Sequence, residues 1–176
     1  MKTRQLIQTA LLIALGLILP MIFHSLGLGK AFLPMHLPAL LAGFLLGPAS
    51  GLCVGLLTPL LSSLLTGMPV LSPPIAFLMM GELGIYGLMG GLMYKRWHFN
   101  VYCSLLVAIA AGRLTFGLLG SSLMPLLGFK PIPVFNLFTV GLLEAIPGVI
   151  LQLVVVPIAV AIGEQNIATI WQRGRV

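Results

Sequence analysis

Three ionisable residues, Glu82, Arg113 and Glu144, stand inside long apolar stretches of the chain. A charged side chain costs at least about 2.5 kcal/mol at the centre of a bilayer, and where one occurs it usually faces a cavity or another charge. Arg113 offers a planar fork of donors that suits a carboxylate or a carbonyl group. These three residues are therefore the first candidates for a binding site.

The spacing of Glu82 and Arg113 predicts that they lie at the same height. Both are nearly equidistant from Arg96-Trp97-His98, which is typical of a turn between two helices. At about 1.5 Å per residue each lies roughly 23 Å from that turn, in the central or outer half of a bilayer. An ion pair is expected, and two interpretations stay open: the pair only joins two helices, or Arg113 faces a cavity and binds a ligand.

Three further polar residues are candidates for lining the site. Tyr86 follows Glu82 by one helical turn, His36 begins the second apolar segment at its outer end, and Asn136 begins the sixth. Glu144 is expected near the outer end of that sixth segment, where it can accept hydrogen bonds from a ligand, remain protonated or share Arg113. Alternatively, a lone Asn, Tyr or His near an interface only satisfies backbone groups.

The elements that must position these residues are membrane helices. The 176-residue chain is 59% hydrophobic and 7% charged, its mean hydropathy is +1.15, and its apolar runs are too long and unalternating for barrel strands. Segments of about 20 apolar residues can span a bilayer. Six candidates cover residues 5–26, 36–46, 49–66, 72–94, 101–127 and 136–163. The expected fold is one all-helical membrane domain over residues 1–176, in which the second segment is short.

Positive charge predicts the orientation of the six segments, because basic loop residues concentrate on the cytoplasmic side. With a cytoplasmic N-terminus, the inner positions hold Lys2, Arg4, Lys95, Arg96, Arg173 and Arg175. Only Lys30 and Lys130 fall outside. Both termini are therefore expected in the cytoplasm, and the net charge of +6 is explained by topology rather than by nucleic-acid binding.

The outer connection between the first two segments is too apolar for an ordinary solvated loop. Phe32, Leu33 and Met35 could cover a site and move on the flanking Gly27 and Gly29, as lids do. A loop that rests passively on the bilayer surface fits these residues equally well.

Ala10 and Ala14 repeat a small residue at an interval of four on the first segment. Small residues at this spacing let two helices approach closely in lipid. A partner helix could dock there, although the same spacing also occurs in ordinary internal packing.

Catalytic and cofactor-binding signatures are absent from the sequence. It has no Asp, no P-loop, no HExxH and no GxSxG, so the usual catalytic constellations have no residues to build from. Cys53 and Cys103 lack metal-ligand spacing and are interpreted as packing residues. An enzyme is not expected, no cofactor or metal is implied, and any pumping must be powered by a partner or an ion gradient.

Three motifs together carry a family resemblance: the stretches 32–48 (FLPMHLPALLAGFLLGP), 59–69 (PLLSSLLTGMP) and 82–87 (ELGIYG). With them the whole chain resembles the substrate-binding S components of energy-coupling factor (ECF) vitamin transporters. The resemblance implies a six-helix plasma-membrane protein that binds a micronutrient near its outer face, under the loop between helices one and two. It also implies docking through Ala10 and Ala14 to a transmembrane coupling subunit driven by two ATPase subunits. No ligand contact is carried over.

The expected function is uptake of a small vitamin, with this chain as the high-affinity binding subunit. Because Arg113 suits a carboxylate, pantothenate is the first expectation, followed by another small vitamin or a queuosine precursor. Few aromatic residues lie near the outer cavity, which disfavours a large stacked heterocycle such as folate. The alternative from another class is an integral membrane scaffold without a ligand, in which the charges are purely structural.

Overall fold

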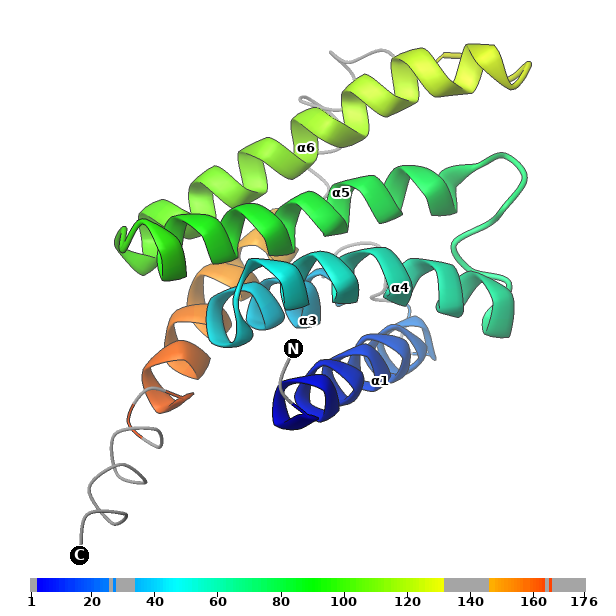
Figure 1. Cartoon of the computed structure of the whole chain (residues 1–176). Helices are drawn as coiled ribbons and strands as arrows, with labels where there is room; N and C mark the ends of the chain where they lie inside the picture. The colour runs from blue at the N-terminus through cyan, green and yellow to red at the C-terminus, as the bar shows by residue number, and fades with distance from the viewer. Residues whose placement is uncertain (1–2, 26, 28–33, 132–145, 164, 166–176) are drawn as a thin grey trace, which may run out of the picture.

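The computed structural model describes residues 3–25, 27, 34–131, 146–163 and 165. Its elements in these ranges are α1 (Thr3–Ser25), α3 (His36–Leu41), the π-helical η1 (Ala42–Leu46), α4 (Pro48–Thr66), α5 (Ile75–Gly91), the π-helical η2 (Leu92–Arg96) and α6 (Val101–Leu126). A further helix covers Ile146–Gly163. In Figure 1, α4, α5 and α6 lie side by side, and α1 flanks α4 on the side away from α5.

Five helices in the described ranges are long and apolar enough to cross a membrane: α1, α4, α5 continued by η2, α6 and Ile146–Gly163. The combined helix His36–Leu46 is apolar but shorter, since its 11 residues rise only about 16 Å, roughly half of a hydrocarbon core. Six full spans are therefore not confirmed. The first ten residues of the sixth predicted segment, 136–145, lie outside the described residues.

The pair α4 and α5 packs backbone against backbone through glycines. A methyl group on Gly51 would collide with the backbone of Gly87, and a methyl group on Gly87 would collide with that of Gly51. Gly55 meets the backbone of Leu83 in the same way. Because lipid supplies no hydrophobic force between helices, this close approach gains the van der Waals contact that holds the two helices together.

One face of α1 is fixed to the start of α4. The Gln5 amide donates hydrogen bonds to the Leu46 carbonyl oxygen (2.9 Å) and to the Ser50 hydroxyl (3.0 Å). Further along the helix, Gly16 is buried against the Thr58 side chain. The opposite face of α1 is not covered by any other described part of the chain.

Several helix ends meet at the end of the molecule where α1 starts. There Leu46 accepts its bond from Gln5, Gly91 lies against Pro48, and Gly163 lies against the Leu45 side chain. The basic last turn of η2 (Lys95 and Arg96) follows Gly91 directly. This end is thus the one that the charge pattern assigns to the cytoplasm, and the assignment of sides stays a prediction.

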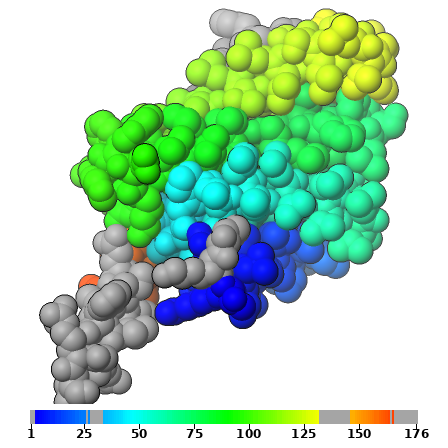
Figure 2. Space-filling model, viewed as in Figure 1, coloured from blue at the N-terminus to red at the C-terminus, as the bar shows by residue number. Residues whose placement is uncertain are grey.

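The core lies where α3, η1, α5, α6 and the helix Ile146–Gly163 meet. Its buried members are Leu37, Leu40, Phe44, Tyr86, Leu105, Ala108, Ile109, Val156 and Val160. In the space-filling view of Figure 2, the side chains of α4, α5 and α6 pack against one another with no wide gap between these helices. The outward positions are apolar too: the exposed residues include Leu11, Ile18, Leu57, Phe77, Leu106, Leu118 and Ile150. A surface of this kind suits a lipid environment.

Candidate functional site

A pocket of about 610 Å³ lies at the end of the molecule opposite to the basic turn of η2. Its described lining comes from five places in the chain: the last turns of α1, the residues at the start of α3, the end of α4, the α4–α5 connection and the first turns of α5. The lining residues are Pro20, Met21, His24, Pro34, Met35, His36, Ser62, Thr66, Met68, Pro69, Val70, Ile75 and Met79. Its volume falls within the range of small-molecule sites.

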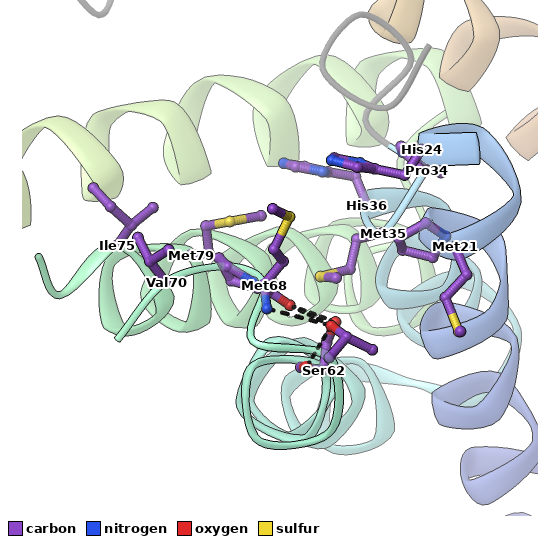
Figure 3. A pocket seen from close by; sticks show the side chains of 13 residues that line it. Met21, His24, Pro34, Met35, His36, Ser62, Met68, Val70, Ile75 and Met79 are labelled. Carbon is purple, nitrogen blue, oxygen red and sulfur yellow. Dashed lines mark hydrogen bonds between the residues drawn. The ribbon is translucent and has the colours of Figure 1, made fainter. Parts of the chain in front are cut away.

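Methionines form much of the pocket wall. Met21 comes from α1, Met35 precedes α3, Met68 lies in the α4–α5 connection, and Met79 lies on α5. Figure 3 shows Met35, Met68 and Met79 approaching the middle of the pocket from different elements. Thioether side chains are flexible and polarizable, so such a wall can adapt to the shape of an apolar or aromatic ligand.

Hydrogen bonds at the end of α4 hold Met68 in place. The Ser62 hydroxyl donates to the Met68 carbonyl oxygen at 2.7 Å, and the Met68 N–H donates to the Thr66 hydroxyl at 3.3 Å. The Thr66 hydroxyl itself donates to the Ser62 carbonyl oxygen at 2.8 Å. These bonds, drawn in part in Figure 3, occupy the hydroxyl protons of both residues. The hydroxyl groups of Ser62 and Thr66 therefore hold the end of α4 and Met68 in place.

A buried polar cluster adjoins the pocket at His36. Glu82 Oε1 lies 3.3 Å from Arg113 Nη1 and 3.6 Å from His36 Nε2. The His36 ring meets the Tyr86 ring edge to face, with 5.0 Å between the centroids. Arg113 and Glu82 thus form the ion pair that their spacing predicted, because the turn between α5 and α6 places them at one height. The cluster joins α3, α5 and α6.

Several polar atoms of this cluster have no hydrogen-bond partner among the described residues. They include both ring nitrogens of His36, the Tyr86 hydroxyl, and Nε and Nη2 of Arg113. His36 is 1% exposed and Glu82 is 2% exposed. Buried polar groups without partners are costly and uncommon, and such a group next to a pocket is a candidate for binding a ligand.

His36 lies deeper than its position in the sequence suggested. It was expected at the outer end of the short second segment, but its imidazole reaches Glu82, which lies in the middle of α5. The short helix His36–Leu46 therefore starts at mid-height and runs to the end where α1 begins. As a result, His36 belongs both to the polar cluster and to the pocket lining.

The other predicted residues divide into three groups. Met35, predicted in the lid, is 6% exposed and lines the pocket. Glu82, Arg113 and Tyr86 are not among the described lining residues. Outside the described residues lie Asn136, Glu144, Phe32 and Leu33.

Most residues of the pocket wall were not predictable from the sequence. Met21, His24, Met68 and Met79 were not predicted, because methionines in apolar segments look like ordinary packing residues. One usable signal was present: Thr66-Gly-Met-Pro-Val70 lies in a turn with prolines, and such a turn holds side chains in fixed positions. The methionines on α1 and α5 gave no signal of that kind.

Ala10 and Ala14 lie on the uncovered face of α1, and both are exposed. Their neighbours on that face, Ile7, Leu11 and Ile18, are each more than half exposed. The described residues that pack against α1 do so on its other side, through Thr9 and Gly16. The small-residue pair is therefore free of contacts from the described part of this chain.

The fold and the pocket together define a helical, multi-pass membrane protein with a pocket of small-molecule size. The model of the family described as ECF transporter, substrate-specific component, matches residues 4–160. The chain belongs to this family. No curated protein and no solved structure matches the chain.

Membership defines the role of the chain in general terms. It is a substrate-specific membrane subunit of an ECF transporter, located in the plasma membrane. Such components bind a small-molecule substrate and work with a module of transmembrane and ATPase subunits. The family is a class of transporter component rather than of enzyme.

Proposed function

We propose that this chain captures a vitamin-sized organic molecule with high affinity in the pocket between α1, α3, α4 and α5. The observation that carries the proposal is the pocket itself, a space of about 610 Å³ with described walls from α1, the start of α3, the end of α4, the α4–α5 connection and α5. It lies at the end predicted to face outward, where a substrate arrives.

We further infer that the lid residues and the polar cluster serve this pocket in different ways. Met35 contributes directly to the wall, and Phe32 and Leu33 are proposed to cover it. Glu82, Arg113 and Tyr86 hold His36 in position beneath the ligand, since Glu82 lies within 3.6 Å of the imidazole. Asn136 and Glu144 remain proposed contacts.

The same proposal includes the partners. Ala10 and Ala14 are exposed small residues one helical turn apart on α1, which suits close approach of a helix from the transmembrane coupling subunit. Two ATPase subunits then supply the energy. Pantothenate was favoured because Arg113 suits a carboxylate, and that preference holds only if Arg113 reaches the ligand.

Mass spectrometry of small molecules extracted from the purified protein tests the proposal. A molecule of vitamin size is expected to co-purify in near-stoichiometric amount with the native chain. It should be absent from Met79→Trp, in which an indole ring fills the pocket, and present in Leu114→Trp, whose position on α6 is 45% exposed and does not line the pocket. Equal amounts in both variants would refute the pocket, and no ligand in any sample would favour a scaffold.

A further inference from the structure

A second pocket, of about 230 Å³, lies at the turn between η2 and α6, at the other end of the molecule from the substrate pocket. Its lining residues are Tyr94, Lys95, His98 and Phe99. The two helices that meet there are long enough to cross a membrane: one ends at Arg96 and the other begins at Val101. A turn between two spanning helices lies at the level of the lipid headgroups, whichever side of the membrane it faces.

Hydrogen bonds fix the conformation of this turn. The N–H groups of Trp97 and Phe99 each donate to a carbonyl oxygen of η2 at 3.0 Å, and Asn100 Oδ1 accepts from the Tyr102 N–H at 3.0 Å. His98 has a φ of 56°, a left-handed conformation that is uncommon for residues other than glycine. Strained conformations of this kind concentrate at ligand sites, and His98 lines the second pocket.

The second pocket is positively charged. Lys95 is partly buried, and its Nζ lies 5.8 Å from the centre of the Tyr94 ring. An ammonium group held over an aromatic ring in this way still has hydrogen-bond donors for an anion. Arg96 follows directly and is exposed, and the positive end of the α6 dipole lies at the same turn. These groups together favour an anionic ligand.

Glu164 is the acidic residue expected at this end of the molecule. It follows Gly163, which lies against Leu45, and is itself outside the described residues. One carboxylate cannot neutralise this end, to which the charge pattern assigns six basic residues: Lys2, Arg4, Lys95, Arg96, Arg173 and Arg175. The net charge around the second pocket is therefore positive.

Aromatic side chains around the second pocket indicate that the anion belongs to a lipid. Trp97, Phe99 and Tyr102 are 56%, 48% and 54% exposed, and exposed aromatic residues beside basic ones are typical of the headgroup level. Basic pockets between membrane helices bind anionic headgroups. We propose that the second pocket binds the phosphate group of an anionic phospholipid. Lys95 and His98 donate hydrogen bonds to the phosphate oxygens, and the Phe99 ring contacts the glycerol part of the lipid.

Native mass spectrometry of the delipidated protein in detergent tests this site by counting bound lipids. Phosphatidylglycerol should bind at least about tenfold more tightly than phosphatidylcholine with the same acyl chains, because only the first has a net negative charge. Equal binding of the two lipids would overturn the proposal. Glycerol 3-phosphate should not displace phosphatidylglycerol, and displacement at a similar concentration would show a site for free phosphate esters instead of a lipid.

Three variants test whether the second pocket itself is the site. Lys95→Gln should lower the affinity for phosphatidylglycerol about tenfold, as expected for one lost hydrogen bond between charged groups. Arg4→Gln, which removes the same charge at the same end but outside the second pocket, should change it little. His98→Gly should also bind the lipid more weakly, yet its unfolding temperature without lipid should not fall, because glycine adopts this φ without strain. Equal losses in Lys95→Gln and Arg4→Gln, or unchanged affinity in Lys95→Gln, would overturn the site.

Discussion

At the residue scale, the central feature is a carboxylate shared by two partners. Glu82 lies near both Arg113 and His36 in the middle of the helices. The pairing of Glu82 with Arg113 was predictable, because a short turn and a fixed helical rise determine both heights. The approach of His36 was not, because hydropathy gives no signal of where a short helix begins within the bilayer.

Substitution of the ion pair separates a structural role from a ligand clamp. Arg113→Met alone should destabilise the protein by about 3 to 5 kcal/mol, because it leaves a buried carboxylate unpaired. The double variant Glu82→Gln with Arg113→Met should recover much of this loss. Calorimetric unfolding in detergent measures the stability of each variant.

Substrate affinity of the folded double variant completes this comparison. We expect affinity within about tenfold of the native value, because neither residue lines the pocket. The variant loses only the contact of Glu82 with His36, and this loss is worth about one hydrogen bond. A double variant that regains stability yet fails to bind would show that Arg113 clamps the ligand directly.

At the element scale, α4 and α5 form the rigid centre on which the pocket is built. The backbones of Gly51 and Gly87 lie in contact, which only residues without a side chain allow. The pocket wall was less predictable, since apolar residues that face a cavity and those that face lipid have the same hydropathy. Met79 and Phe77, both on α5, illustrate this: one lines the pocket and the other is 47% exposed.

Gly87→Ala should destabilise the protein by at least about 1 to 3 kcal/mol, because the added methyl group meets the Gly51 backbone, which cannot move aside as a side chain can. Gly84→Ala on the same helix is the matched control. There the methyl group would lie 3.2 Å from the ends of the Leu52 and Leu56 side chains, which can shift. Equal unfolding temperatures for the two variants would contradict backbone packing between α4 and α5.

The uncovered face of α1 gives a second prediction at this scale. Ala14→Trp should fold and bind substrate normally, because Ala14 is exposed, yet it should lose the coupling subunit because an indole ring blocks close helix approach. Leu118→Trp, at a position on α6 that is 61% exposed, controls for the bulky ring. Co-purification of the coupling subunit with Ala14→Trp at normal yield would exclude this face as the docking site.

At the scale of the whole molecule, sequence reasoning predicted the environment better than the topology. Composition alone indicated a helical membrane protein, and the family match confirms that class. The count of six spans is not confirmed at His36–Leu46, which was expected to be short, since a stretch of that length fits either a short span or a helix that begins at mid-depth. The contact of His36 with Glu82 favours a helix that begins at mid-depth, and this contact exists only in the folded protein.

Transport into vesicles should depend on the coupling and ATPase subunits. The sequence has no nucleotide-binding signature, so vesicles that contain this chain alone should bind substrate without concentrating it. Vesicles with the coupling and ATPase subunits should accumulate substrate when ATP is present. Concentrative uptake by the chain alone, measured with radiolabelled substrate, would contradict this division.

The most direct test of the account is an experimental structure of the protein with its co-purified molecule bound. The account predicts ligand density enclosed by Met35, Met68 and Met79, with a polar atom of the ligand within hydrogen-bonding distance of His36. Density that lies outside this pocket, or a ligand carboxylate bound to Arg113 in place of Glu82, would contradict it.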